Sequence, residues 1–322
     1  MKRYTFIDYT TQAYIALIAL LILFFHNQSI PGWPWLLAAH AVGMGAVHWL
    51  VQTRARHPEN CVLNFVRHFY PVMLYLAFYR ETGELNHLFA CEFLDSFFIR
   101  LDERIFGGQP SISFMPHMPY WPVSEIFFAA YFSYYVMIVV LAIALFMRDR
   151  GQFFHYVSVL SFIFYVCYLV YIFMPVIGPR IFHLVVNGYS LPPDVQPAVL
   201  PDFPATLKAG PFFRLMSWLY DIFEAPGAAF PSSHVAAAIG MLYFSSRYLP
   251  RIRIGHSIVV VLLCLATVYC RYHYAVDVIA GILAAALLIP IGNWLYFQFR
   301  CPQAETTEVT TTARALEVQG SH

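Results

Sequence analysis

The sequence predicts an all-α protein that crosses a membrane several times. Of its 322 residues, 60% are hydrophobic and only 11% are charged, and the mean hydropathy is +0.60. A soluble domain carries about 25% charged residues, so this chain has too few to cover a water-facing surface. Its long apolar runs are typical of a polytopic transmembrane helical bundle. The net charge of +1 provides no basic face, so we expect no nucleic-acid partner.

Eight apolar runs approach the length of about 17–25 residues that a membrane-spanning helix needs. The first and third are short and need flanking residues to complete a crossing. A further stretch, Cys91–Phe106, is apolar but is broken by charged residues, which indicates an amphipathic helix at the membrane interface rather than a span. In chain order, the eight predicted spans are Gln12–His26, Trp33–Val51, Phe65–Tyr79, Val123–Met147, Phe154–Pro175, His234–Tyr248, Ile254–Arg271 and Tyr274–Tyr296.

Arginine residues give these eight spans one consistent orientation. Arg54 and Arg56 follow the second span, Arg148 follows the fourth, and Arg251 separates the sixth from the seventh. With eight spans all of these residues lie on one side, which the positive-inside rule assigns to the cytoplasm together with both termini. The interfacial segment and the long loop after the fifth span then lie on the opposite, external side.

One segment on the external side opens the sixth span. Gly227–His234 reads GAAFPSSH, and its Ser232, Ser233 and His234 begin an apolar helix. The start of a helix exposes unpaired N–H groups and the positive end of the dipole, which suits a phosphate, and two serines add hydroxyl donors. The alternative is an ordinary serine N-cap with a histidine that extends to the membrane interface.

A second segment, Arg271–Asp277, joins the last two spans and reads RYHYAVD. His273 and Asp277 are about one helical turn apart and share a helix face. A carboxylate there can hold the imidazole in one tautomer and raise its basicity, while a histidine from another helix donates a proton. An Asp one turn inside a membrane helix is costly and marks a functional site by default, although a structural His–Asp pair is the alternative.

A third segment, Pro175–Arg180, follows the fifth span on the same external side. The guanidinium of Arg180 can form paired hydrogen bonds with phosphate oxygens. The alternative for this segment alone is a plain arginine next to the membrane.

Together, the three segments in this order resemble the type 2 phosphatidic acid phosphatase superfamily of membrane lipid phosphatases and phosphotransferases. The resemblance covers roughly Tyr171–Pro290 and is most specific in Ala229–His234 and His273–Gly281. It implies a six-helix core within the bundle and a site that uses neither a metal ion nor another cofactor.

The resemblance also implies a role for each motif residue. His273 is the nucleophile that forms a phosphohistidine, Asp277 orients it, and His234 protonates the leaving group. The phosphate-binding residues that it implies are Arg180, Ser232 and Ser233.

The chain departs from the superfamily pattern at two phosphate-binding cations. Phe173 stands where the pattern has Lys, and Pro179 precedes Arg180 instead of following an arginine. Ala266–Thr267 occupy the places of a Ser-Arg pair. The candidates to replace the missing cations are Arg271, Lys208 and Arg214.

These departures are similar to the inositol phosphorylceramide synthase-like branch, whose members move a phosphoryl headgroup between lipids. The stretch Asp102–Pro110 adds to that similarity. The same phosphohistidine chemistry serves a phosphatase when water is the acceptor and a transferase when a lipid or polyol hydroxyl is the acceptor.

We therefore expect an integral membrane enzyme of the plasma or inner membrane that acts on a phospholipid or sphingolipid phosphate at the external face. We expect N-terminal helices in 1–122, a catalytic transmembrane core in 123–300 and a disordered cytoplasmic tail in 301–322. The missing cations motivate an alternative: a catalytically silent lipid-binding or transport protein with the same bundle. A transporter would place ionisable residues near the middle of its spans, whereas here the polar motifs lie at one interface. The sequence does not indicate an oligomeric state.

Overall fold

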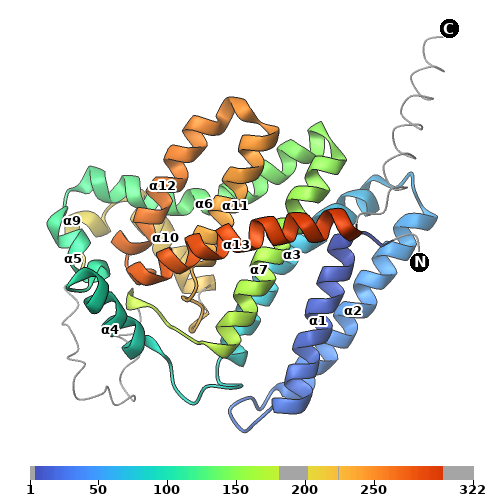
Figure 1. The fold of residues 1–322 in the computed structure, drawn as a ribbon, viewed down its shortest axis with the longest axis horizontal. Coiled ribbons are helices and arrows are strands. Elements are labelled where there is room, and N and C mark those ends of the chain that lie inside the picture. The colour runs from blue at the N-terminus through green and yellow to red at the C-terminus, as the bar shows by residue number, and fades with distance from the viewer. Residues whose placement is uncertain (1–3, 181–201, 224, 300–322) are drawn as a thin grey trace.

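The computed structural model describes residues 4–180, 202–223 and 225–299, which form an all-α bundle without strands (Figure 1). The predicted fold class is therefore confirmed, while the predicted tail lies outside the described residues. The helices are α1 (Phe6–Phe25), α2 (Trp33–Arg56), α3 (Cys61–Leu85), α4 (Asp95–Phe106), α5 (Pro110–His117), α6 (Trp121–Arg148), α7 (Arg150–Phe173), α9 (Ala205–Lys208), α10 (Pro211–Phe223), α11 (Ser233–Tyr248), the 3₁₀ turn η1 (Pro250–Ile252), α12 (Arg253–Tyr269) and α13 (Ala275–Phe299).

All eight predicted spans are helical, but they differ in length. Within the described residues, seven helices are long and apolar enough to cross a membrane, namely α1, α2, α3, α6, α7, α12 with its preceding turn, and α13. Flanking residues extend the first and third runs, as their shortness required. The remaining run, the sixth in the chain, is α11, whose 16 residues span about 24 Å at 1.5 Å per residue. It is therefore shorter than a hydrocarbon core of about 30 Å.

Helix α7 is the centre of the bundle and the most deeply buried of the spans. It packs against α1, α3, α6, α11 and α13. In Figure 1 the α1–α2 hairpin lies at the right and α4 and α5 lie at the left, with α13 crossing α7 between them. Most of the apolar core lies around α7, because every neighbouring helix turns a face toward it.

Hydrogen bonds between side chains join the N-terminal helices to α7. The hydroxyls of Thr11 on α1 and Tyr165 on α7 are 2.9 Å apart, and those of Tyr75 on α3 and Ser161 on α7 are 2.7 Å apart. Such interhelical bonds contribute about 0.6–2 kcal/mol each within a membrane, where lipid offers no alternative partner. They fix the position of α3 relative to the core.

The predicted interfacial helix is present as α4, and its buried face carries two carboxylates. Asp95, Phe98, Ile99 and Asp102 are all buried, whereas Glu103 is exposed. The spacing of the four buried residues is that of one helical face. Two of the charges that interrupt this apolar stretch therefore point into the protein rather than toward water.

Helix α10 is an amphipathic helix in the loop after the fifth span. The carboxylate of Glu125 on α6 accepts hydrogen bonds from the backbone amides of Phe212 and Phe213 at 2.8 and 3.2 Å. A carboxylate at a helix N-terminus satisfies unpaired amides and stabilises the positive end of the dipole. This cap holds α10 against the outer part of α6.

Helices α11 and α13 approach each other closely at Gly281. A Cβ atom at Gly281 would lie 2.7 Å from the carbonyl oxygen of Ser232 and 2.9 Å from Cβ of Val235. The backbone of Ser232 is also tied to α13, because its amide donates to the carbonyl of Asp277 at 3.1 Å. Only glycine permits this contact without displacing the start of α11.

We predict that Gly281→Ala lowers the thermal stability of the detergent-solubilised protein. The added methyl group forces α13 away from α11, and overpacking of this kind costs about 1–3 kcal/mol. Gly255→Ala on α12 is the matched control, since a Cβ atom there meets nothing within 4 Å. A melting temperature for Gly281→Ala equal to that of Gly255→Ala would contradict the close approach.

Candidate active site

The three motif segments meet at one end of the bundle. Helix α7 ends there, and α11 and α13 begin there. Val176 links the first two segments, because its amide donates to Gly227 and its carbonyl accepts from Ala229. The connection that holds Arg148 and Arg150 lies at the other end of α7. The site is therefore on the side of the bundle away from this arginine-rich connection.

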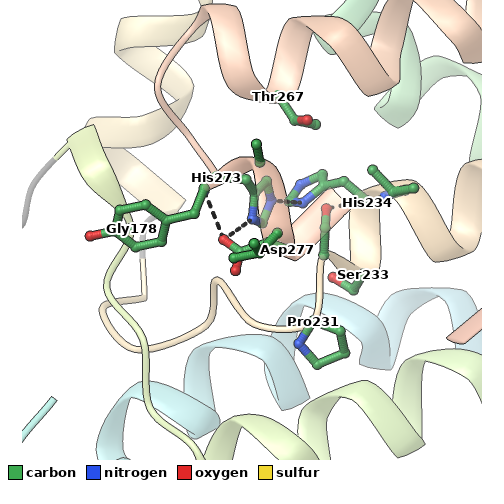
Figure 2. A network of polar contacts seen from close by, with 12 residues as sticks. Gly178, Pro231, Ser233, His234, Thr267, His273 and Asp277 are labelled. Carbon is green, nitrogen blue, oxygen red and sulfur yellow. Dashed lines mark hydrogen bonds and ion pairs between the residues drawn. The ribbon is translucent and has the colours of Figure 1, made fainter. Parts of the chain in front are cut away.

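His273 lies between His234 and Asp277 (Figure 2). Nε2 of His273 is 3.4 Å from Nδ1 of His234, and Nδ1 of His273 is 3.5 Å from Oδ2 of Asp277. The two imidazole rings have centroids 5.5 Å apart and planes inclined by 62°. The structure thus brings together the three residues to which the resemblance assigns catalytic roles.

The His273 imidazole is enclosed by protein. Burial lowers its pKa to about 4, although a hydrogen bond with the backbone of Ala229 acts to raise the pKa. The ring is therefore neutral near pH 7 and keeps a lone pair on one nitrogen. Asp277 is fully buried beside Nδ1, and its Oδ2 also accepts from the amide of Tyr274 at 2.9 Å. With Nδ1 facing the carboxylate, Nε2 is the nitrogen left to react.

His234 is the second residue of α11 and lies on the side of His273 that is opposite Asp277. Its Nε2 is 3.1 Å from the hydroxyl of Tyr131 on α6, and its ring packs against that of Tyr134. One nitrogen of His234 therefore faces His273 while the other has a hydroxyl partner. This arrangement suits a group that passes a proton.

Asp95 of α4 joins the first and third motif segments. Its carboxylate accepts from the amides of Ile177 and Gly178 at 2.9 and 2.8 Å and from the hydroxyl of Tyr274 at 2.9 Å. Burial raises the pKa of Asp95 to about 6, while these hydrogen bonds lower it. Gly178 has a φ of 94°, and a Cβ atom there would lie 2.8 Å from the carbonyl oxygen of Tyr272. The two segments are held in contact at this point.

Asp102, two turns further along α4, caps the start of α13. Its two carboxylate oxygens accept from the amides of Ala275 and Val276 at 3.0 and 2.9 Å. Burial raises the pKa of Asp102, and the same two hydrogen bonds lower it. The first amides of α13 are thus bound within the protein, and Asp277 is fixed one turn after His273.

Tyr171 on α7 orients the start of α11. Its hydroxyl donates to the carbonyl of Pro231 at 3.0 Å and accepts from the amide of Ser233 at 3.1 Å. Ser232 is the N-cap of α11, and its hydroxyl accepts from the amide of Val235. Ser232 thus caps α11, as the alternative interpretation of this segment expected. Phosphate binding by Ser232 and Ser233 stays a prediction.

Two arginines adjoin the site. Nη1 of Arg180 donates to the hydroxyl of Tyr272 at 2.7 Å, and its guanidinium lies 4.7 Å from the ring centroid of Tyr220. Arg271 is buried, with its guanidinium 4.5 Å from the ring centroid of Phe203. Its φ of 64° is in the left-handed region, which costs a residue other than glycine about 1 kcal/mol or more. A strained and buried arginine two residues before His273 is consistent with a functional constraint.

The two departures from the superfamily pattern have structural counterparts. Phe173 is 44% exposed and stacks on Phe89 with ring centroids 4.4 Å apart, so it supplies an apolar contact in place of a cation. The carbonyl of Thr267 accepts from the amides of Tyr272 and His273 at 2.9 and 3.1 Å. Thr267 therefore shapes the turn that presents His273.

Sequence reasoning missed the supporting residues of this site. Asp95, Asp102, Tyr131 and Tyr171 were not among the predicted site residues. The spacing of the two aspartates with Phe98 and Ile99 on α4 was a usable signal, because it placed both carboxylates on the apolar face of the helix. No pattern in the sequence distinguished the two tyrosines from the many others. Among the described residues, no three His, Cys, Asp or Glu side chains are arranged to hold a metal ion.

Residues 97–291 match the PAP2 superfamily, and this match covers more than half of the chain. The protein therefore belongs to the PAP2 superfamily, a class of phosphatases and phosphotransferases, and has the helices of an integral membrane protein. The match runs from α4 into α13 and leaves α1, α2 and α3 outside it. No curated protein and no solved structure matches the chain.

We predict that Asp95→Asn lowers the turnover of a phosphate ester about tenfold or more. The amide keeps the size of the side chain but loses one acceptor for the backbone of the first segment, and a hydrogen bond to a charged group contributes about 1.5–3 kcal/mol. Glu103→Gln, on the exposed face of the same helix, is the matched control. Wild-type turnover in Asp95→Asn would show that α4 does not position the site.

Proposed function

We propose that this protein is a membrane lipid phosphotransferase or phosphatase that works through a phosphohistidine on His273. The observation that carries the proposal is the position of His273 between a carboxylate and a second imidazole. His273 lies within 3.5 Å of both of the other groups, and all three come from segments of the superfamily match.

In the first step, the lone pair on Nε2 of His273 attacks the phosphorus atom. The N–P bond forms as the ester P–O bond breaks, and the leaving oxygen takes its proton from His234. The phosphorylated imidazole carries a positive charge that the carboxylate of Asp277 stabilises at Nδ1. General acid catalysis by a residue such as His234 contributes about 10²–10⁴-fold.

In the second step, His234 acts as the base. It takes a proton from water or from an acceptor hydroxyl, whose oxygen attacks the phosphorus as the N–P bond breaks. His273 is released neutral, and His234 is again protonated for the next cycle. Water as the acceptor yields a phosphatase, and a lipid or polyol hydroxyl yields a transferase.

The two imidazoles must separate to admit the substrate. A reacting atom sits about 3–3.5 Å from its nucleophile before attack, and the two facing nitrogens are themselves only 3.4 Å apart. We propose that the His234 ring turns away from His273 when a phosphate enters.

The charge of the site favours the transferase version. Phe173 and Thr267 replace two cations of the superfamily pattern, and Arg180 and Arg271 are the arginines beside the site. A phosphodiester carries one negative charge, whereas a phosphomonoester carries up to two near pH 7. A site with fewer cations suits the diester, as in headgroup transfer by the inositol phosphorylceramide synthase-like branch. We further propose that the site faces the external side, because the arginine-rich connections lie at the opposite end.

We predict that His273→Ala abolishes turnover and phosphoenzyme formation while the protein still inserts and folds. The phosphoenzyme is trapped by alkaline quenching, since phosphohistidine is labile in acid, and is mapped by mass spectrometry. His117→Ala, an exposed histidine of α5, is the control and keeps full activity. Activity in His273→Ala, or a phosphate mapped to another residue, would refute the mechanism, and binding of lipid without any phosphoenzyme would favour the silent alternative.

His234→Ala separates the acid role from a structural one. It should lose about 10²–10⁴-fold in turnover of an alkyl phosphate, which needs a proton on its leaving oxygen. An aryl phosphate needs no such proton, so the variant should still form the phosphoenzyme and accumulate it. Equal losses with both substrates would argue that His234 only supports the fold.

Metal chelators should leave the wild-type activity unchanged.

A labelled phospholipid supplied with and without a lipid or polyol alcohol distinguishes the two acceptors. The transferase version predicts a labelled product that depends on the alcohol. If the labelled phosphate group is transferred only to water, whatever alcohol is added, the transferase version is contradicted.

A further inference from the structure

An apolar cavity of about 330 Å³ adjoins His234 and is lined mainly by side chains of the long apolar helices α3 and α6. Ser233 and His234 form its polar end. The remaining lining is aliphatic and aromatic: side chains of α3 and α6 supply most of it, which we call its walls, and Phe164 and Tyr168 of α7 and Leu219 of α10 also contribute. This volume is within the range of about 300–1,000 Å³ that is typical of sites for small molecules.

The cavity opens sideways, between two membrane-spanning helices. Leu76 of α3 and Tyr135 and Val139 of α6 line it and are 44%, 37% and 46% exposed, respectively. Exposed apolar side chains on spans of this kind face lipid hydrocarbon rather than water. A hydrocarbon chain can therefore enter from the bilayer without crossing an aqueous phase.

We propose that this cavity, defined by its walls on α3 and α6, holds a hydrocarbon chain of the donor lipid and that its end at His234 holds the ester oxygen that leaves. This inference rests on the proposed function and names the part of the substrate that departs. His234 protonates the leaving oxygen, and the cavity adjoins His234 rather than the Asp277 side of His273. The bond that breaks therefore lies between phosphorus and the oxygen of the lipid alcohol. The phosphate, with any headgroup, passes to His273, and the neutral lipid alcohol remains in the cavity with the proton from His234.

Helix α3 lies outside the superfamily match, so its part of the lining can set which lipid chains this protein accepts. Val72, Tyr75, Leu76 and Tyr79 form its wall, and all of them precede residue 97, where the match begins. The hydrogen bond of Tyr75 to Ser161 fixes this wall to α7. The N-terminal helices thus set the length and shape of the chain that fits, while the matched helices carry the chemistry.

Substitutions that narrow the cavity test whether it holds a lipid chain. Val72→Trp and Leu76→Trp place an indole in the cavity, and Met73→Trp places it on the lipid-facing side of the same helix, where Met73 is 57% exposed and does not line the cavity. The two cavity variants should lose about tenfold or more in turnover of a dioleoyl lipid relative to its dioctanoyl analogue, since each lost methylene contact is worth about 10-fold or more. Met73→Trp should keep the wild-type ratio. An unchanged ratio in both cavity variants would overturn the inference.

A binding measurement separates this inference from the proposed function. A phospholipid with a photoactivatable diazirine in its acyl chain is cross-linked to His273→Ala, and the adducts are mapped by mass spectrometry. We expect adducts on the cavity-facing residues of α3 and α6 that an excess of unlabelled phospholipid suppresses. Such adducts together with a failure to trap phosphohistidine in the wild type would refute the proposed function but support the cavity. Adducts spread evenly over the lipid-facing sides of α1, α2 and α6 would overturn the cavity proposal, whatever the activity.

Discussion

Two buried carboxylates on one short helix hold the site together. Asp95 binds the backbone of the first motif segment and the Tyr274 side chain of the third, and Asp102 caps the start of α13. Each carboxylate loses hydration on burial, and hydrogen bonds to backbone amides offset that loss. These contacts add to the bonds from the amides of Tyr272 and His273 to the carbonyl of Thr267, which hold the other side of the turn that carries His273. The position of α4 beside α13 therefore helps to fix where His273 lies.

A neutral imidazole at His273 and an apolar cavity beside His234 give the site its character. Burial keeps the His273 imidazole uncharged, and the cavity places hydrocarbon next to His234. Under the proposed function, the polar half of a lipid phosphate would lie with Arg180 and the start of α11, and its apolar half would lie between α3 and α6. Such a division would let one site handle a charged group and a hydrocarbon chain without drawing the whole lipid into water.

The hydropathy of the chain predicted the helical bundle well, and the motifs predicted the residues that meet. All eight apolar runs are helices, because length and hydropathy alone dictate helix formation in a membrane. The spacing of His273 and Asp277 placed them on one helix face, and they lie side by side. The inward turn of Asp95 and Asp102 was not predicted, because the charged residues of this stretch were interpreted only as the sign of an interfacial helix. The contact of Tyr131 with His234 and the cavity wall on α3 depend on how distant helices pack, which no local pattern specifies.

The most direct test of this account is a structure of the wild-type protein with orthovanadate, whose five-coordinate form resembles a phosphoryl group in transfer. The account predicts a vanadium atom bonded to Nε2 of His273, the His234 ring displaced from its present contact, and one of its nitrogens within hydrogen-bond distance of the oxygen opposite His273. Vanadate bound at another residue, or bound while the two imidazoles remain 3.4 Å apart, would contradict it.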